Sequence, residues 1–203
     1  MKLSIPFLAV ALLAAQTTLA SVVFDEAVSG DLADGNAPAP TPVSLSVGSN
    51  VVNGSVSAGQ GDTRDYWTFT LPPGSALAAV AQLAYDDPNV DNGVFDGNRG
   101  FYALLDGEST TVPGSGFASL GGDHLDPIGP GANLLPAISG GGISGGDGFS
   151  LPLGPGTYTF QVQQTGPQVS RYSLDFVVIP EPATAAFVLP TALATMLRRR
   201  NRR

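Results

Sequence analysis

The sequence predicts an all-β protein, an antiparallel β-sandwich with a jelly-roll-like arrangement of its strands. Three observations support this fold class. Apolar and polar residues alternate in several short segments, as they do in strands with one buried face. Gly and Pro are abundant, with 26 and 17 residues, and they gather between those segments, as expected of turns. Residues 43–179 contain no apolar pattern of helical period long enough to predict a helix.

The first half of this region contains the clearest predicted strand. Residues 43–47 alternate between apolar and small polar side chains, and Asn53-Gly54 lies between β-branched residues, where a two-residue hairpin turn is expected. The segment 66–71 follows and ends at Pro72-Pro73-Gly74. Residues 77–85 can form the strand that returns beside it. The apolar face of the segment 66–71 is expected to consist of Trp67, Phe69 and Leu71.

The second half alternates in three further segments. Residues 100–105 predict a strand that turns at Asp106-Gly107, and the segments 157–163 and 171–178 predict the last two strands. Between them, residues 109–148 are dominated by Gly, Pro and Ser. We expect at most short strands there, such as one at residues 117–120.

The first 20 residues are typical of a secretory signal peptide. Lys2 precedes an apolar run at residues 5–15, and the small-residue site Thr18-Leu19-Ala20 follows, so we expect signal peptidase to cleave after Ala20. The next segment, 21–42, is rich in Pro and offers little to bury. It is therefore predicted to be a flexible N-terminal arm, with room for a short strand at its start.

The last 24 residues predict a temporary membrane anchor. Pro180-Glu181-Pro182 precedes an uncharged segment, 183–197, and the chain then ends in an Arg-rich tail. Lys and Arg resist translocation, so Arg198, Arg199 and Arg200 are expected to stop transfer and to stay in the cytoplasm, with the body outside. As a short hydrophobic helix, the segment 183–197 would span about 22 Å, less than a hydrocarbon core of about 30 Å.

These terminal residues resemble the PEP-CTERM sorting signal of Gram-negative bacteria that make exopolysaccharide. The resemblance covers residues 179–203 and depends on the Pro-Glu-Pro motif, the apolar run and the basic end in that order. It implies that an exosortase-type protease of the inner membrane cuts near Pro180-Glu181-Pro182 and passes the protein to the cell surface or the biofilm matrix. An ordinary C-terminal membrane anchor, or a buried helix with a basic end, is the alternative.

The charge of the exported body restricts its partners. Without the two end segments it keeps three of the nine basic residues and 16 of the 17 acidic residues, a net charge of −13. Such a body repels nucleic acid and anionic lipid, and its natural counterparts are cations, calcium above all. The absence of Cys excludes disulfides, thiolate metal sites and Cys nucleophiles.

Three pieces of the body resemble bacterial pre-peptidase C-terminal domains, which are extracellular β-sandwiches. The pieces are residues 61–72, 153–160 and 172–176, whereas the long segments 86–99 and 106–150 depart from the pattern. This resemblance implies an accessory or binding role rather than catalysis.

One loop concentrates oxygen ligands that suit calcium. Asp87, Asn89 and Asp91 match positions 1, 3 and 5 of an EF-hand loop, but Asn92 and Asn98 stand where that loop needs Gly and Glu. A calcium site of another type, with these three residues as ligands, is one interpretation. A solvated turn rich in Asp, Asn and Gly is the other.

Catalysis has weaker support in the sequence. Gly142-Ile143-Ser144-Gly145-Gly146 matches the G-x-S-x-G pattern of serine hydrolases, but the only histidine, His124, precedes it and no helix pattern follows. The segment 140–149 also resembles one calcium-binding nonapeptide repeat, an architecture that needs several stacked copies. We therefore expect a protein that is not an enzyme, without catalytic or cofactor-binding residues.

Aromatic residues leave sugar binding open. Trp67, Tyr66 and Tyr102 could stack on sugars, although aromatic residues in alternating strands usually belong to the core. Tyr66 faces away from Trp67 and is the best candidate. The leading hypothesis is thus a non-enzymatic surface or matrix protein associated with exopolysaccharide. A carbohydrate- or calcium-dependent binding module is the alternative, and a secreted hydrolase comes third.

Overall fold

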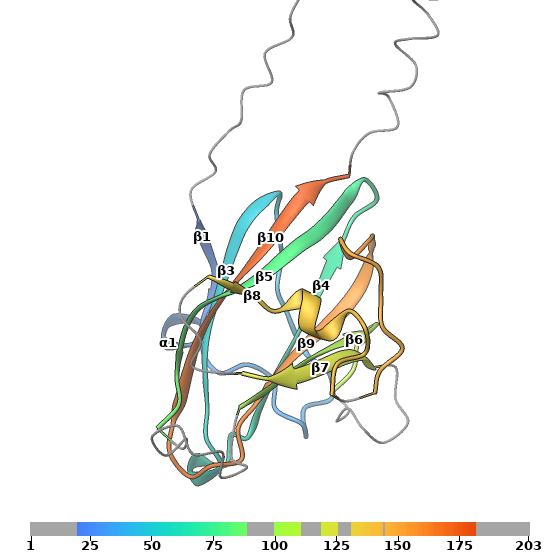
Figure 1. The fold of residues 1–203 in the computed structure, drawn as a ribbon. Helices are drawn as coiled ribbons and strands as arrows, with labels where there is room; N and C mark the ends of the chain where they lie inside the picture. Colours follow the sequence, from blue (N-terminus) through green and yellow to red (C-terminus); the bar gives the residue numbers. More distant parts are fainter. Residues whose placement is uncertain (1–19, 89–99, 111–118, 126–130, 144, 182–203) are drawn as a thin grey trace, which may run out of the picture.

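The computed structural model describes residues 20–88, 100–110, 119–125, 131–143 and 145–181, which form two five-stranded β-sheets (Figure 1). The first sheet has the strand order β1 (Ser21–Asp25), β3 (Gly48–Val56), β10 (Ser170–Pro180), β5 (Ser75–Asp86) and β8 (Ala132–Asn133). The second has the order β2 (Thr41–Pro42), β4 (Arg64–Leu71), β9 (Gly156–Gln163), β6 (Phe101–Asp106) and β7 (Ser119–His124). The helical elements are α1 (Glu26–Ser29), a 3₁₀ turn (Ala58–Gln60) and α2 (Leu135–Ile138).

The two sheets pack face to face through an aromatic core. The ring centroid of Trp67 on β4 lies 5.1 Å from that of Phe160 on β9 and 5.9 Å from that of Phe176 on β10 in the other sheet. The predicted apolar face of the segment 66–71 is confirmed, because Trp67, Phe69 and Leu71 are buried, and the alternating apolar residues of β9 and β10 are buried as well. This is the β-sandwich that the period-two pattern predicts.

Both sheets are mixed rather than purely antiparallel. The edge strands β1 and β2 pair in parallel with β3 and β4, while the other strand pairs are antiparallel. From β1 to β5 the chain enters the two sheets alternately, so β1 is joined to β3 by a crossover through the other sheet. A crossover permits parallel pairing, which a hairpin does not.

The predicted turn at Asn53-Gly54 is wrong, because both residues lie inside β3. Gly54 pairs with Tyr172 on β10, and a Cβ atom at residue 54 would overlap the Tyr172 ring. The glycine therefore serves close packing rather than a turn. The strand predicted at residues 43–47 is also displaced, since the chain pairs with β4 two residues earlier, at β2.

The segment 21–42 differs from the expected flexible arm. It forms β1, α1 and β2, and Leu32 is buried in the core. The carbonyl of Ala33 accepts a hydrogen bond from the Tyr66 N–H at 2.8 Å. The segment is thus held to both sheets by backbone pairing, by Leu32 and by the partly buried Val23 and Phe24.

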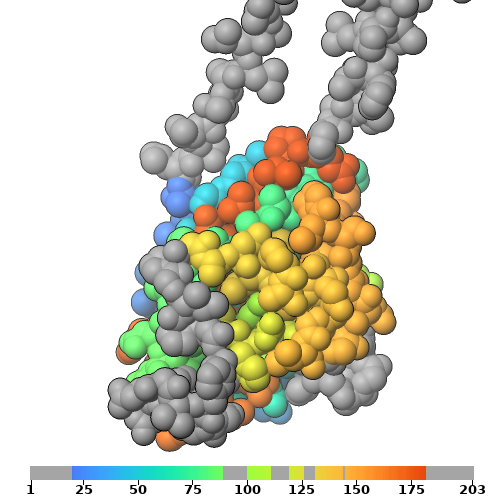
Figure 2. Space-filling view, viewed as in Figure 1, coloured from blue at the N-terminus to red at the C-terminus, as the bar shows by residue number. Residues whose placement is uncertain are grey.

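Helix α2 and the residues after it close one side of the sandwich. Leu135 and Ile138 are fully buried, and α2 contacts β5 of one sheet and β7 of the other. Figure 2 shows residues 131–143 and 145–155, yellow to orange, as one continuous surface over this side.

The two ends of the folded body lie at the same end of the first sheet. Ser21 on β1 and Phe176 on β10 both pair with Asn50 on β3, and β10 runs on from there to Pro180 (Figure 1). The predicted apolar segment 183–197 lies outside the described residues. Within the described part of the chain, none of the helices has the length and hydrophobicity to cross a bilayer.

Candidate metal centre

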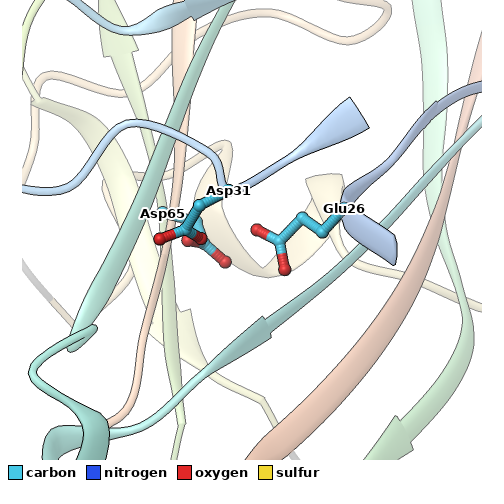
Figure 3. A group of neighbouring side chains, drawn as sticks. All are labelled: Glu26, Asp31 and Asp65. Carbon is cyan, nitrogen blue, oxygen red and sulfur yellow. The ribbon is translucent and has the colours of Figure 1, made fainter. Parts of the chain in front are cut away.

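Three carboxylates meet where the chain passes from β1 towards the second sheet. Glu26 begins α1, Asp31 follows it, and Asp65 is the second residue of β4. One carboxylate oxygen of each residue lies within 4.8 Å of the others. Figure 3 shows the Glu26 side chain pointing towards Asp31 and Asp65.

Local hydrogen bonds hold Glu26 in place. Its Oε1 accepts from the Leu32 N–H at 3.2 Å, and its Oε2 accepts from the Ser55 N–H at 2.7 Å. Strand β1 ends at Asp25, so it has no backbone carbonyl opposite the Ser55 N–H of β3. The Glu26 carboxylate accepts the hydrogen bond from this N–H instead. Asp25 in turn caps α1 through the Ala27 N–H at 3.0 Å.

Asp65 is the buried member of the cluster. Its side chain points into the core, like that of Trp67 two residues later on β4, and none of its surface is exposed. Its Oδ2 accepts a hydrogen bond from the Tyr172 hydroxyl at 2.7 Å, whereas its Oδ1 has no hydrogen-bond partner among the described residues. A buried carboxylate oxygen without a partner is costly and calls for a cation or a proton.

The electrostatics of the cluster favour neutralisation. Burial raises the pKa of Asp65 well above its usual range, and the charge of Glu26 raises it further, against the hydrogen bond from Tyr172. Asp62, just before β4, has its pKa raised to about 7 by burial and then by the charges of Asp31, Glu26 and Asp34. Burial also raises the pKa of Glu26. A divalent cation would remove this repulsion.

The ligand set fits calcium. Calcium prefers six to eight oxygen ligands at about 2.3–2.6 Å, so two of its ligands lie at most about 5 Å apart. Three carboxylate oxygens within 4.8 Å of one another satisfy this limit. Glu26, Asp31 and Asp65 would hold the ion, and backbone carbonyls or water would complete its shell. Magnesium needs a shorter and more regular octahedron.

The structure describes only the first residues of the predicted calcium loop, up to residue 88. Asp87 accepts hydrogen bonds from the Tyr85 hydroxyl at 2.5 Å, the Gln164 amide at 2.5 Å and the Ser170 hydroxyl at 2.7 Å. These contacts tie the ends of β5, β9 and β10 together. Asn89 and Asp91 lie outside the described residues, so calcium binding at this loop stays a prediction.

The Gly-rich segment that matched G-x-S-x-G lies along the edge of β7. Gly142 forms a parallel bridge with Gly122, and the Ile143 N–H donates to the Gly122 carbonyl at 2.9 Å. Ser144 lies outside the described residues. Residues 145–155 lead to strand β9 rather than into a helix, which is unlike the strand–turn–helix of a nucleophile elbow.

The aromatic candidates for sugar stacking are all buried. Trp67 and Tyr66 have no exposed surface, and Tyr102 is 1 % exposed. None of the three offers a ring face to a ligand in this structure. His124 is exposed at the end of β7, where its backbone N–H donates to the Asp123 carboxylate at 2.7 Å.

The predicted sorting motif begins at the last residue of β10. Pro180 is the last residue of β10 and pairs with Ser75, and the Glu181 N–H donates to the Gly74 carbonyl at 2.9 Å. Pro182, Arg198, Arg199 and Arg200 lie outside the described residues.

Sequence reasoning missed this candidate metal centre. Glu26 and Asp31 lie in the segment predicted to be an arm, and Asp65 lies in a strand where it interrupts an apolar face. The one signal in the sequence was Asp65 itself. It stands two residues before Trp67, where the alternation of β4 predicts a buried side chain, and carboxylates are seldom buried without a partner. Comparisons of the chain with models of known protein families, with curated proteins and with solved structures found no match.

Proposed function

We propose that this chain is an exported, non-enzymatic protein of the cell surface or extracellular matrix whose jelly-roll-like sandwich binds calcium. The calcium proposal depends on one observation, the fully buried Asp65 carboxylate whose Oδ1 lacks a partner beside Glu26 and Asp31. Calcium sites of extracellular modules have Kd values of about 10⁻⁴–10⁻³ M, which suit a protein that meets calcium outside the cell.

The positions of the two chain ends support export and sorting. Predicted cleavage after Ala20 would leave Ser21, the first residue of β1, as the new N-terminus. The Pro-Glu-Pro motif begins at the last residue of β10. Both predicted targeting segments are therefore joined to the body at the same end of one sheet.

Calcium binding is tested by titration calorimetry on the purified protein. We expect one calcium ion to bind at the cluster of Glu26, Asp31 and Asp65, with weaker binding of magnesium, and we expect Asp65→Asn to abolish binding at this cluster. Asp106→Asn is the matched control, because it removes the same charge from the opposite end of the second sheet. Calcium affinity that is equal in the two variants would contradict the site.

Sorting is tested by cell fractionation and intact-mass measurement in a bacterium that has an exosortase-type protease. We expect the extracellular protein to have lost both ends, near Ala20 and near Pro180. Changing Pro180, Glu181 and Pro182 together to Ala should retain the chain in the inner membrane, whereas Pro167→Ala should not. Recovery of the full-length tail in the extracellular fraction would count against this route.

A further inference from the structure

One row of side chains crosses the four long strands of the second sheet. Arg64 on β4 pairs with Gln163 on β9, Gln163 pairs with Phe101 on β6, and Phe101 pairs with His124 on β7. Residues in register project from the same face of a sheet. Their neighbour Val162 points into the core, so the row Arg64–Gln163–Phe101–His124 lies on the outer face. His124 is exposed and the other three are half-buried.

This row combines planar polar groups with an aromatic ring. The Arg64 Nε–H donates to Gln163 Oε1 at 3.1 Å, and the rings of Phe101 and His124 are 6.1 Å apart at 77°. The Phe101 ring lies over Gly122, where a Cβ atom would overlap it. An aromatic ring laid on the sheet beside a guanidinium and an amide provides a stacking surface with flanking hydrogen-bond groups.

The adjacent row leaves hydrogen-bonding capacity unused. Tyr66 and Gln161 are register partners on this face, one step further along the strands from Arg64 and Gln163. The Tyr66 hydroxyl and Gln161 Oε1 are buried and have no hydrogen-bond partner among the described residues. Both side chains are fully buried, so these two atoms lie out of reach of a bound ligand, and the accessible surface is the row Arg64–Gln163–Phe101–His124 itself.

The composition of the row favours one class of partner. The predicted exported body, residues 21–179, has a net charge of −13 and repels polyanions, and the polar row offers little to an apolar surface. A neutral chain of sugars presents hydroxyl groups together with apolar ring faces, which matches both the polar groups and Phe101. We propose that the row Arg64–Gln163–Phe101–His124 is the binding surface for a neutral polysaccharide.

In this arrangement the Phe101 ring stacks on a sugar ring, and Arg64 and Gln163 bind the hydroxyl groups beside it. The surface is separate from the metal centre, because Arg64 and Asp65 are consecutive and project from opposite faces of β4. Polysaccharide binding therefore does not depend on the calcium proposal, and chelation should leave it unchanged.

Affinity electrophoresis of the purified protein in gels that contain a soluble β-glucan, a galactomannan or alginate tests this surface. We expect a neutral polymer to retard the protein, and we expect Phe101→Ala and Arg64→Ala each to weaken binding at least tenfold. Arg171→Ala is the matched control, because it removes the same charge from β10 of the other sheet and should bind normally. Near-ultraviolet circular dichroism checks that each variant is folded, and Gln163→Ala replaces Phe101→Ala if that variant unfolds.

Three outcomes would overturn the proposal. One is the absence of retardation by either neutral polymer, and another is equal weakening by Arg64→Ala and Arg171→Ala. The third is binding that is lost with a chelator and is unaffected by Arg64→Ala, because the polymer would then be held at the metal centre. A calcium titration of the same samples separates failure of this surface from failure of the calcium site.

Discussion

Replacing Asp65 with Asn should change the stability of the protein in opposite directions without and with calcium. Without calcium, the variant loses a buried carboxylate oxygen that has no partner beside Glu26. The amide of Asn can still accept from the Tyr172 hydroxyl and can donate to a neighbouring carboxylate. An unsatisfied buried polar group costs about 1–3 kcal/mol, so the free energy of unfolding should rise by that amount.

With calcium, the order should reverse. A ligand present at one hundred times its Kd stabilises the folded state by about 2.7 kcal/mol. For a body of this size, 1 kcal/mol shifts Tm by about 2–4 °C, so calcium should raise the wild-type Tm by about 5–10 °C. Asp65→Asn removes one of three carboxylate ligands, and the variant should gain almost nothing from calcium.

Thermal unfolding by circular dichroism, in chelator and in calcium, measures both effects with the same samples. Asp106→Asn is the control and should follow the wild type in both conditions. A calcium-dependent rise in the Tm of Asp65→Asn as large as that of the wild type would refute the metal centre. A calcium-free Tm below that of the wild type would refute the argument from the unpaired oxygen.

Three further predictions concern pH, packing and the base of the acidic loop. The pKa of Asp62 is raised to about 7 in the folded protein, so its contribution to stability is complete at low pH and is lost as pH rises from about 4 towards about 7. The calcium-free Tm should therefore fall across that window, and a Tm that rises steadily with pH would contradict the assignment. Gly54→Ala should destabilise the protein by about 1–3 kcal/mol or more, because its Cβ overlaps a buried ring, whereas Gly140→Ala has open space and should be nearly neutral in urea unfolding. Asp87→Ala removes an acceptor of three hydrogen bonds and should cost at least about 3 kcal/mol by the same measurement. The exposed neighbour Asp86 provides its control, and equal losses in the two Ala variants would show that these hydrogen bonds contribute little.

Local patterns predicted the strands with long alternating segments. The inward faces of β4, β9 and β10 follow from alternation alone, because each side chain's direction depends only on its position along the strand. The turn predicted from Asn53-Gly54 was wrong, because the glycine lies within β3 and Tyr172 on a distant strand packs against it. The parallel pairing of β1 and β2 was also missed, since it depends on the path of the chain between sheets.

The sequence by itself determined the β-rich fold class and the acidic character of the body, and it supplied many carboxylates and aromatic rings without indicating which of them form a site. Only the tertiary structure decided which of them meet. Glu26 and Asp31 approach Asp65 because a crossover carries the chain from one sheet to the other. Arg64, Gln163, Phe101 and His124 form one row because four strands pair in one register. Register and crossover are set by contacts between distant segments, and periodicity within a segment does not encode them.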